Sequence, residues 1–135
     1  MKKEIAILVV DDEPIMQTLL QKILTRDGYR VLSAGDGKEA LDVMSREQIS
    51  LVISDLQMPG MGGFELLKTL KEKHPHVAVI IMTAYGDTYS VKDALLLGAD
   101  EYITKPFKSL EISMIVERAY WRLLAHENRL ASETD

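Results

Sequence analysis

The chain has 135 residues and a formal net charge of −5; hydrophobic residues make up 47% of it and charged residues 27%. This length suits one compact domain with a single core, and the negative charge argues against a surface that binds nucleic acid. Cysteine is absent, which excludes disulfides and thiolate metal sites and is compatible with a reducing cytoplasm.

The first apolar run, at residues 5–10, is stopped by Asp11 and Asp12, too early for the core of a signal peptide. Neither this run nor the one at 77–82 approaches the ~20 apolar residues that a membrane-spanning helix needs. We therefore expect a soluble protein located in the cytoplasm. Both runs are typical of strands that are buried on both faces of a parallel sheet.

Along the chain, predicted strands alternate with predicted amphipathic helices. The strands are expected at 5–10, 30–34, 51–54, 77–82 and 101–104. The helices are expected at 14–26, 38–46, 64–73, 88–97 and from 109 to about 130. This alternation implies right-handed crossovers and an α/β fold, a doubly wound parallel sheet of five strands with helices on both faces.

The first predicted helix has Pro14 in its first turn, where proline is well tolerated. Its apolar residues recur at helical spacing, and we expect them to share one face that packs on the sheet. These residues are Ile15, Leu19, Leu20, Ile23 and Leu24.

Chemically reactive side chains stand where four of the predicted strands end. The carboxyl ends of parallel strands share one edge of a sheet, where ligands gather. Asp11 and Asp12 follow the first strand, Asp55 ends the third, Thr83 ends the fourth, and Lys105 and Pro106 follow the fifth. We therefore expect these side chains to converge into one site.

Three carboxylates at one edge require a cation, because two charges at 4 Å repel by about 4 kcal/mol at an effective dielectric constant near 20. Oxygen ligands without His or Cys favour Mg²⁺. Asp55 can then act as a nucleophile towards phosphorus, while the metal and the Lys105 ammonium stabilise negative charge on the phosphoryl oxygens. The product is an aspartyl phosphate, to which the Thr83 hydroxyl can donate a hydrogen bond.

Four segments, VVDDE, ISDLQMPGMGG, IIMTAYG and YITKPF, resemble the receiver domains of two-component response regulators. The resemblance covers residues 5 to about 122 and implies the flavodoxin-like strand order 2-1-3-4-5. It implies that Asp55 is the phosphoacceptor. It also implies that Asp12, Asp55 and the backbone carbonyl of Gln57 bind Mg²⁺ directly, and that Asp11 binds it through water.

The same resemblance implies that Lys105 binds the phosphoryl group, that Thr83 is the switch hydroxyl and that Tyr102 is the aromatic switch. It implies a cis peptide bond between Lys105 and Pro106. The implied partners are a histidine kinase, which donates the phosphoryl group, and a downstream effector domain or protein. That effector is expected to read the surface of the fourth helix, fifth strand and fifth helix.

Two further segments, 83–87 and 127–130, resemble receivers of transcriptional activators that have a central ATPase domain. We assign residues 1–122 to the receiver domain and 123–135 to an extension of the last helix, a linker or a coiled coil. Ile112, Val116, Ala119, Leu123, His126 and Leu130 recur in alternating steps of four and three. This spacing predicts either a coiled-coil seam, which would form a homodimer, or an ordinary stripe that faces the core.

Two other functions share some of these features. A hydrolase with an aspartyl-phosphate intermediate needs an acid for the leaving group, and Gln57 stands where such phosphatases commonly have a second Asp. A flavodoxin-like flavin carrier needs a loop that holds phosphate after the first strand, and residues 11–13 are acidic. We therefore expect a phosphorylatable switch and not a turnover enzyme. His74, His76 and His126 show no metal-ligand spacing and are assigned no role.

Overall fold

The computed structural model describes residues 5–58, 60–84 and 88–134. The strands are β1 (Ala6–Val10), β2 (Arg30–Ala34), β3 (Leu51–Asp55), β4 (Ala78–Ala84) and β5 (Glu101–Lys105). The helices are α1 (Pro14–Arg26), α2 (Gly37–Arg46), α3 (Gly63–Lys73), α4 (Thr88–Leu96) and α5 (Ser109–Thr134). Every predicted element is present, and most boundaries lie within two residues of their predicted positions.

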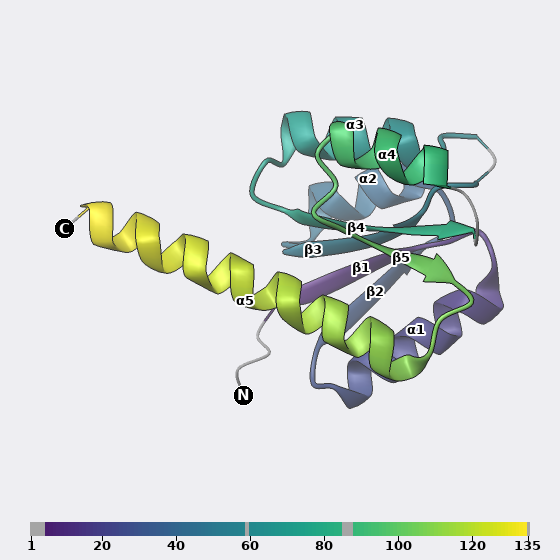
Figure 1. Cartoon of the computed structure of the whole chain (residues 1–135), viewed down its shortest axis with the longest axis horizontal. Helices are drawn as coiled ribbons and strands as arrows, with labels where there is room; N and C mark the ends of the chain where they lie inside the picture. Colours follow the sequence, from purple (N-terminus) through teal and green to yellow (C-terminus); the bar gives the residue numbers. More distant parts are fainter. Residues whose placement is uncertain (1–4, 59, 85–87, 135) are drawn as a thin grey trace.

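The five strands form one parallel sheet in the order β2-β1-β3-β4-β5. Helices α1 and α5 cover one face of the sheet, and α2, α3 and α4 cover the other (Figure 1). The predicted doubly wound α/β fold and strand order are therefore confirmed. Among the described residues, no helix combines the length and apolar character needed to cross a membrane.

The sheet separates two hydrophobic cores because successive side chains of a strand point to opposite faces. In β1, Leu8 and Val10 pack under α2 and α3, whereas Ile7 and Val9 pack against α1 and α5. All five positions of β1 are buried. This burial on both faces accounts for the nearly continuous apolar run from which the strand was predicted.

The prediction for α1 was wrong at two positions. Leu20 and Leu24 are buried as expected, but Ile15 is 85% exposed and Leu19 is 41% exposed. Each residue turns an α-helix by about 100°, so Ile15 lies about 140° around the helix from Leu20. The face that packs on the sheet is therefore narrower than the apolar pattern, and α1 presents apolar side chains to solvent.

Helix α5 is longer than the sheet that it covers, and its C-terminal half projects past the body of the domain (Figure 1). Of the predicted seam, Ile112, Val116 and Ala119 are buried in the core beside α1. For this part the core-facing alternative is correct, because side chains packed on the domain's own sheet are not available to a second chain. The Leu130 side chain lies outside the described residues.

Candidate functional site

Three carboxylates meet at the carboxyl end of the sheet. Asp11 and Asp12 follow β1 and Asp55 is the last residue of β3; one carboxylate oxygen from each lies within 4.8 Å of the others. Asp11 is fully buried and Asp55 is 6% exposed, whereas Asp12 is exposed. Buried carboxylates need compensating partners. The structure thus brings the carboxylates of the three residues together, as the sequence predicted.

The carboxylates of Asp11 and Asp55 are anchored in the same way. Asp11 Oδ1 accepts a hydrogen bond of 2.9 Å from the Glu13 N–H, and Asp55 Oδ1 accepts one of 3.2 Å from the Gln57 N–H. In each case the donor lies two residues further along the chain, as in an Asx-turn. One oxygen of each carboxylate is thus held by the loop, and the other is directed towards Lys105.

Lys105, the last residue of β5, brings the compensating positive charge. Its Nζ lies 3.0 Å from Asp55 Oδ2 and 3.3 Å from Asp11 Oδ2. Burial alone would lower the pKa of Lys105, but its hydrogen bond and charge interaction with Asp55, supported by Asp11, raise that pKa above its ordinary value. The ammonium therefore stays charged. The Lys105–Pro106 peptide bond is cis.

The folded protein disfavours the charged form of the Asp11 carboxyl. Burial raises the pKa of its carboxyl above the ordinary value, and the negative charge of Asp55 adds to this effect. The hydrogen bond from Glu13 and the charge of Lys105 act in the opposite direction but do not cancel it. A divalent cation beside Asp11 would offset the cost of burying its negative charge next to that of Asp55.

Thr83 near the end of β4 is 1% exposed, and its Oγ1 is buried without a hydrogen-bond partner among the described residues. A buried hydroxyl without a partner costs roughly 1–3 kcal/mol. Tyr102 on β5 is 43% exposed. Within the described part of the chain, this end of the sheet thus has a Thr83 hydroxyl without an acceptor and a Tyr102 ring turned partly to solvent. Residues 85–87, which follow β4, lie outside the described residues.

Two further residues support the site, and only Gly63 stands in a segment that the sequence analysis singled out. Gln17 of α1 donates from Nε2 to the Asp11 carbonyl at 2.6 Å, so the helix holds the loop that carries Asp11. Gly63 begins α3 directly against the end of β3: a Cβ there would lie 2.4 Å from the Asp55 carbonyl oxygen and 2.6 Å from the Leu56 Cα. Gln17 carries no sequence signal of its own, since it acts through a contact that only the fold creates, whereas Gly63 is the last residue of the segment ISDLQMPGMGG.

The sequence profile of the response regulator receiver domain matches residues 7–117. The chain belongs to the response regulator receiver domain family. Receiver domains are the phosphoacceptor switches of two-component signalling and interact with histidine kinases. The hydrolase and flavin-carrier alternatives are not favoured by this membership.

Similar receiver domains occur alone and within longer proteins. The chain is 38% identical over 112 residues to sporulation initiation phosphotransferase F of Bacillus subtilis, and the match covers 83% of this chain and 90% of that protein. It is also 38% identical to the DNA-binding transcriptional regulator NtrC of Klebsiella pneumoniae, across 82% of this chain and 24% of NtrC. The chain thus spans about a quarter of the NtrC relative.

Solved receiver structures share the fold. A receiver domain protein from Clostridium thermocellum superposes with a TM-score of 0.82 at 33% identity, covering 93% of this chain and 98% of that one. NtrX from Brucella abortus in complex with ADP superposes with a TM-score of 0.89 at 30% identity, covering 98% of this chain and 30% of NtrX.

Proposed function

We propose that Asp55 is the phosphoacceptor of this receiver domain and takes its phosphoryl group from the phosphohistidine of a histidine kinase. The observation that carries the proposal is the placement of Lys105, whose Nζ lies 3.0 Å from Asp55 Oδ2 at the carboxyl end of the sheet. In the transfer, an Asp55 carboxylate oxygen forms a bond to phosphorus. The P–N bond to the kinase histidine breaks, and its electron pair leaves with the imidazole.

The acidic cluster fits Mg²⁺, since it supplies carboxylate oxygens and no nitrogen or sulfur ligand. We assign direct coordination to Asp12, Asp55 and the backbone carbonyl of Gln57, and coordination through water to Asp11. When bound, the cation offsets the repulsion among the carboxylates and the negative charge of the phosphoryl oxygens. Lys105 can stay paired with the phosphoryl oxygens because its pKa is raised.

Thr83 and Tyr102 form the proposed switch. The Thr83 hydroxyl has no acceptor among the described residues, and a phosphoryl oxygen on Asp55 would supply one. Movement of Thr83 towards Asp55 would then open space for the Tyr102 ring to turn inward and change the surface of α4, β5 and α5. The phosphoryl group can bias this equilibrium only by interacting better with one state, typically by about 1–3 kcal/mol.

The test is intact-mass measurement after incubation with acetyl phosphate. With Mg²⁺ the protein should gain one phosphoryl adduct, and EDTA should prevent it. Asp55→Asn should remove the adduct, whereas Asp42→Asn on the exposed surface of α2 should keep it, since Asp42 loses the same charge but is not part of the acidic cluster. Undiminished labelling of Asp55→Asn would rule out Asp55 as the acceptor.

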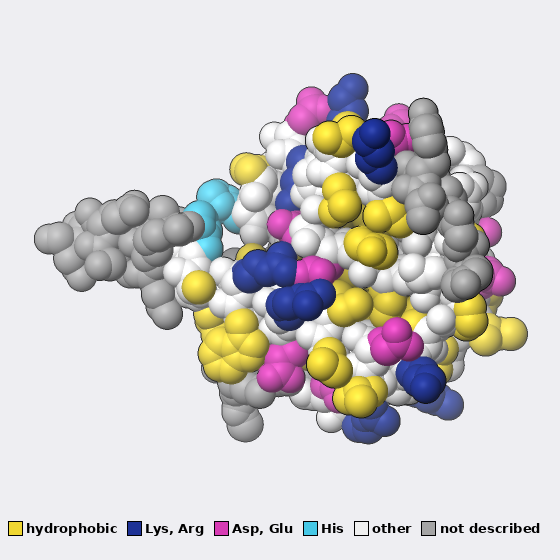
Figure 2. Space-filling view, viewed as in Figure 1, with side chains coloured by type: hydrophobic (Ala, Val, Ile, Leu, Met, Phe, Trp, Pro, Cys, Tyr) yellow, Lys and Arg dark blue, Asp and Glu magenta, His cyan; other side chains and the backbone are white. Residues whose placement is uncertain are grey.

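We further propose that the domain self-associates in part through α5 and that residues 123–135 form a linker to an effector. On the face of α5 that points away from the core, Leu110, Met114 and Trp121 are exposed. Hydrophobic side chains lie along α5 on this face of the molecule (Figure 2). Equilibrium sedimentation should show a dimer that Met114→Glu weakens. A monomer at high micromolar concentration, with or without phosphorylation, would contradict this.

A further inference from the structure

A cavity lies at the end of the sheet opposite the acidic cluster, where β4 begins and α5 leaves the body of the domain. Its volume is about 240 Å³. Ten residues line it: Lys71, Pro75, His76, Val77, Ala78, Asp100, Ala119, Arg122, Leu123 and His126. They come from α3, the segment before β4, the first residue of β4, the residue before β5, and α5. The proposed phosphoryl chemistry uses none of them.

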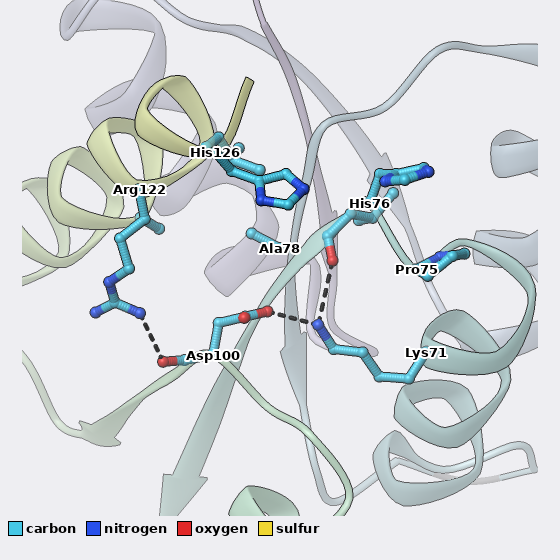
Figure 3. Close-up of a pocket in the computed structure, with 10 residues that line it drawn as sticks. Lys71, Pro75, His76, Ala78, Asp100, Arg122 and His126 are labelled. Atoms are coloured by element: carbon cyan, nitrogen blue, oxygen red, sulfur yellow. Dashed lines mark hydrogen bonds and ion pairs between the residues drawn. The ribbon is translucent and has the colours of Figure 1, made fainter. Parts of the chain in front are cut away.

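The cavity has two nitrogen-bearing walls. Lys71 and His76 lie on one side, and Arg122 and His126 of α5 lie on the other (Figure 3). Apolar side chains of Val77, Ala78, Ala119 and Leu123 also line the cavity. Asp100 lies between Lys71 and Arg122 and contacts both (Figure 3). A ligand that matches both features carries an acidic group at each end of a short apolar chain.

The cationic groups are held in place before any ligand arrives. Lys71 Nζ lies 2.7 Å from Asp100 Oδ2 and 3.3 Å from the Val77 carbonyl oxygen. Asp100 Oδ2 also accepts a hydrogen bond of 2.7 Å from the Val79 N–H, so this carboxylate is fixed from two sides. An ammonium has three N–H donors, and the two hydrogen bonds of Lys71 leave a third donor for a ligand.

Arg122 is fixed in a similar way. Its Nη1 donates to the Asp100 carbonyl oxygen at 3.2 Å, and its Nη2 pairs with Glu101, which also pairs with Arg118. A guanidinium has five N–H donors, so donors remain beyond these contacts. Of the lining residues, Lys71 and Arg122 are positive and Asp100 is negative. Glu101, outside the lining, shares its negative charge between Arg122 and Arg118.

We propose that this cavity binds a small dicarboxylate, with one carboxylate at Lys71 and the other at Arg122. The volume is below that of ordinary drug-sized sites, and none of the ten lining residues is Phe, Tyr or Trp, so a nucleotide or flavin is a poor match. A bound dicarboxylate would join the end of α3 to α5 at the point where α5 projects from the domain. The ligand would therefore regulate the direction of the α5 extension, independently of Asp55.

The experiment titrates the full chain with glutarate, and with pentanoate as the matched monocarboxylate, at constant ionic strength and without Mg²⁺. Two readouts follow binding: the amide NMR shifts of Lys71, His76 and Arg122, and the fluorescence of Trp121, the single tryptophan of the chain. Glutarate should give saturable shifts at the cavity, and pentanoate should bind at least about tenfold more weakly, a loss of about 1.4 kcal/mol.

Variants locate the site. Arg122→Gln should weaken glutarate at least about tenfold, whereas Lys73→Gln, an exposed lysine two residues from Lys71, should not. Asp55→Asn should bind glutarate as the parent does, which separates this site from the phosphoacceptor. Lys71→Gln should weaken glutarate in the same way as Arg122→Gln. If Lys71→Gln does not fold, the Arg122→Gln and pentanoate comparisons decide the question. Shifts that rise linearly without saturation, or equal binding by Arg122→Gln, would overturn the proposal.

Discussion

Asp11, which follows β1, and Asp55, the last residue of β3, direct one oxygen each to the same Lys105 ammonium, at 3.3 and 3.0 Å. Each holds its other oxygen on the N–H two residues further along the chain. The loops after β1 and β3 therefore present two carboxylates with little freedom to move apart. The two carboxylates repel each other, and the Lys105 ammonium offsets this repulsion. Changes to these groups should therefore alter the stability of the folded domain.

Asp11→Asn should raise the free energy of unfolding at pH 7. The pKa of Asp11 is raised mainly by burial, so the charged form is less stable in the folded protein than in the unfolded chain. A group of this kind favours folding below its unfolded pKa and loses that contribution as the pH rises. The gain in Asp11→Asn should therefore be present at pH 7 and fade as the pH falls towards 3.8. Urea unfolding over this range checks the prediction.

Mg²⁺ should stabilise the folded protein, because the assembled acidic cluster is absent from the unfolded chain. At a free concentration ten times Kd the gain is about 1.4 kcal/mol. Asp12→Asn should lose most of this gain while changing stability little without the metal, since Asp12 is exposed. Thermal unfolding with Mg²⁺ or EDTA measures both effects. An equal response of Asp12→Asn and the parent would contradict the assignment of Asp12 as a ligand.

Gly63→Ala should destabilise the domain by about 1–3 kcal/mol, the usual cost of overpacking. The added Cβ would lie 2.4 Å from the Asp55 carbonyl oxygen, so either α3 or the end of β3 must move. Phosphorylation by acetyl phosphate should slow as well. Gly62→Ala is the matched control, because a Cβ there meets nothing closer than 3.7 Å. Denaturant unfolding and mass measurement of the two variants give the comparison.

Thr83→Val should raise the stability of the unphosphorylated protein by about 1 kcal/mol, because it replaces a buried hydroxyl that has no partner among the described residues. The same variant should lose the extra stability that phosphorylation gives the parent. Thr83→Ser keeps the hydroxyl and should retain that gain. Hydrogen exchange of α4 and β5 amides, with and without acetyl phosphate, measures the difference. A full response in Thr83→Val would count against its role as the switch hydroxyl.

Tyr29 should make the domain sensitive to alkaline pH. Burial, with the charges of Glu117 and Asp27, raises the pKa of Tyr29 to about 12. A raised pKa contributes stability that is complete below pH 10 and is lost as the pH rises towards 12, by about 3 kcal/mol. Tyr29→Phe should lose less stability over this range. Urea unfolding at pH 9 and at pH 11.5 tests the difference.

Much of the fold and the acidic cluster could be predicted because parallel strands impose a simple geometry. Strands that are buried on both faces leave long apolar runs, and the ends of such strands meet at one edge. The convergence of Asp11, Asp55 and Lys105 follows from these two facts. No side-chain geometry had to be known in advance.

The parts of the fold and the site that were not predicted depend on contacts that the order of residues along the chain does not show. The exposure of Ile15 is set by the width of the helix face that meets the sheet, and not by hydrophobicity. The cavity at the other edge combines Lys71 with Arg122, 51 positions further along the chain, and each residue alone is an ordinary surface cation. His76 and His126 were assigned no role from sequence, yet both line this cavity.

The unbroken course of α5 gives the domain a lever arm. Its 26 residues correspond to a rod of about 39 Å at 1.5 Å per residue. A rigid tilt of about 10° at the Ser109 end would carry the far end sideways by about 7 Å. Lys105 lies only four residues before α5 begins. A sub-ångström rearrangement near Lys105 can thus displace the C-terminal end of α5 far enough to make or break its contacts with another molecule.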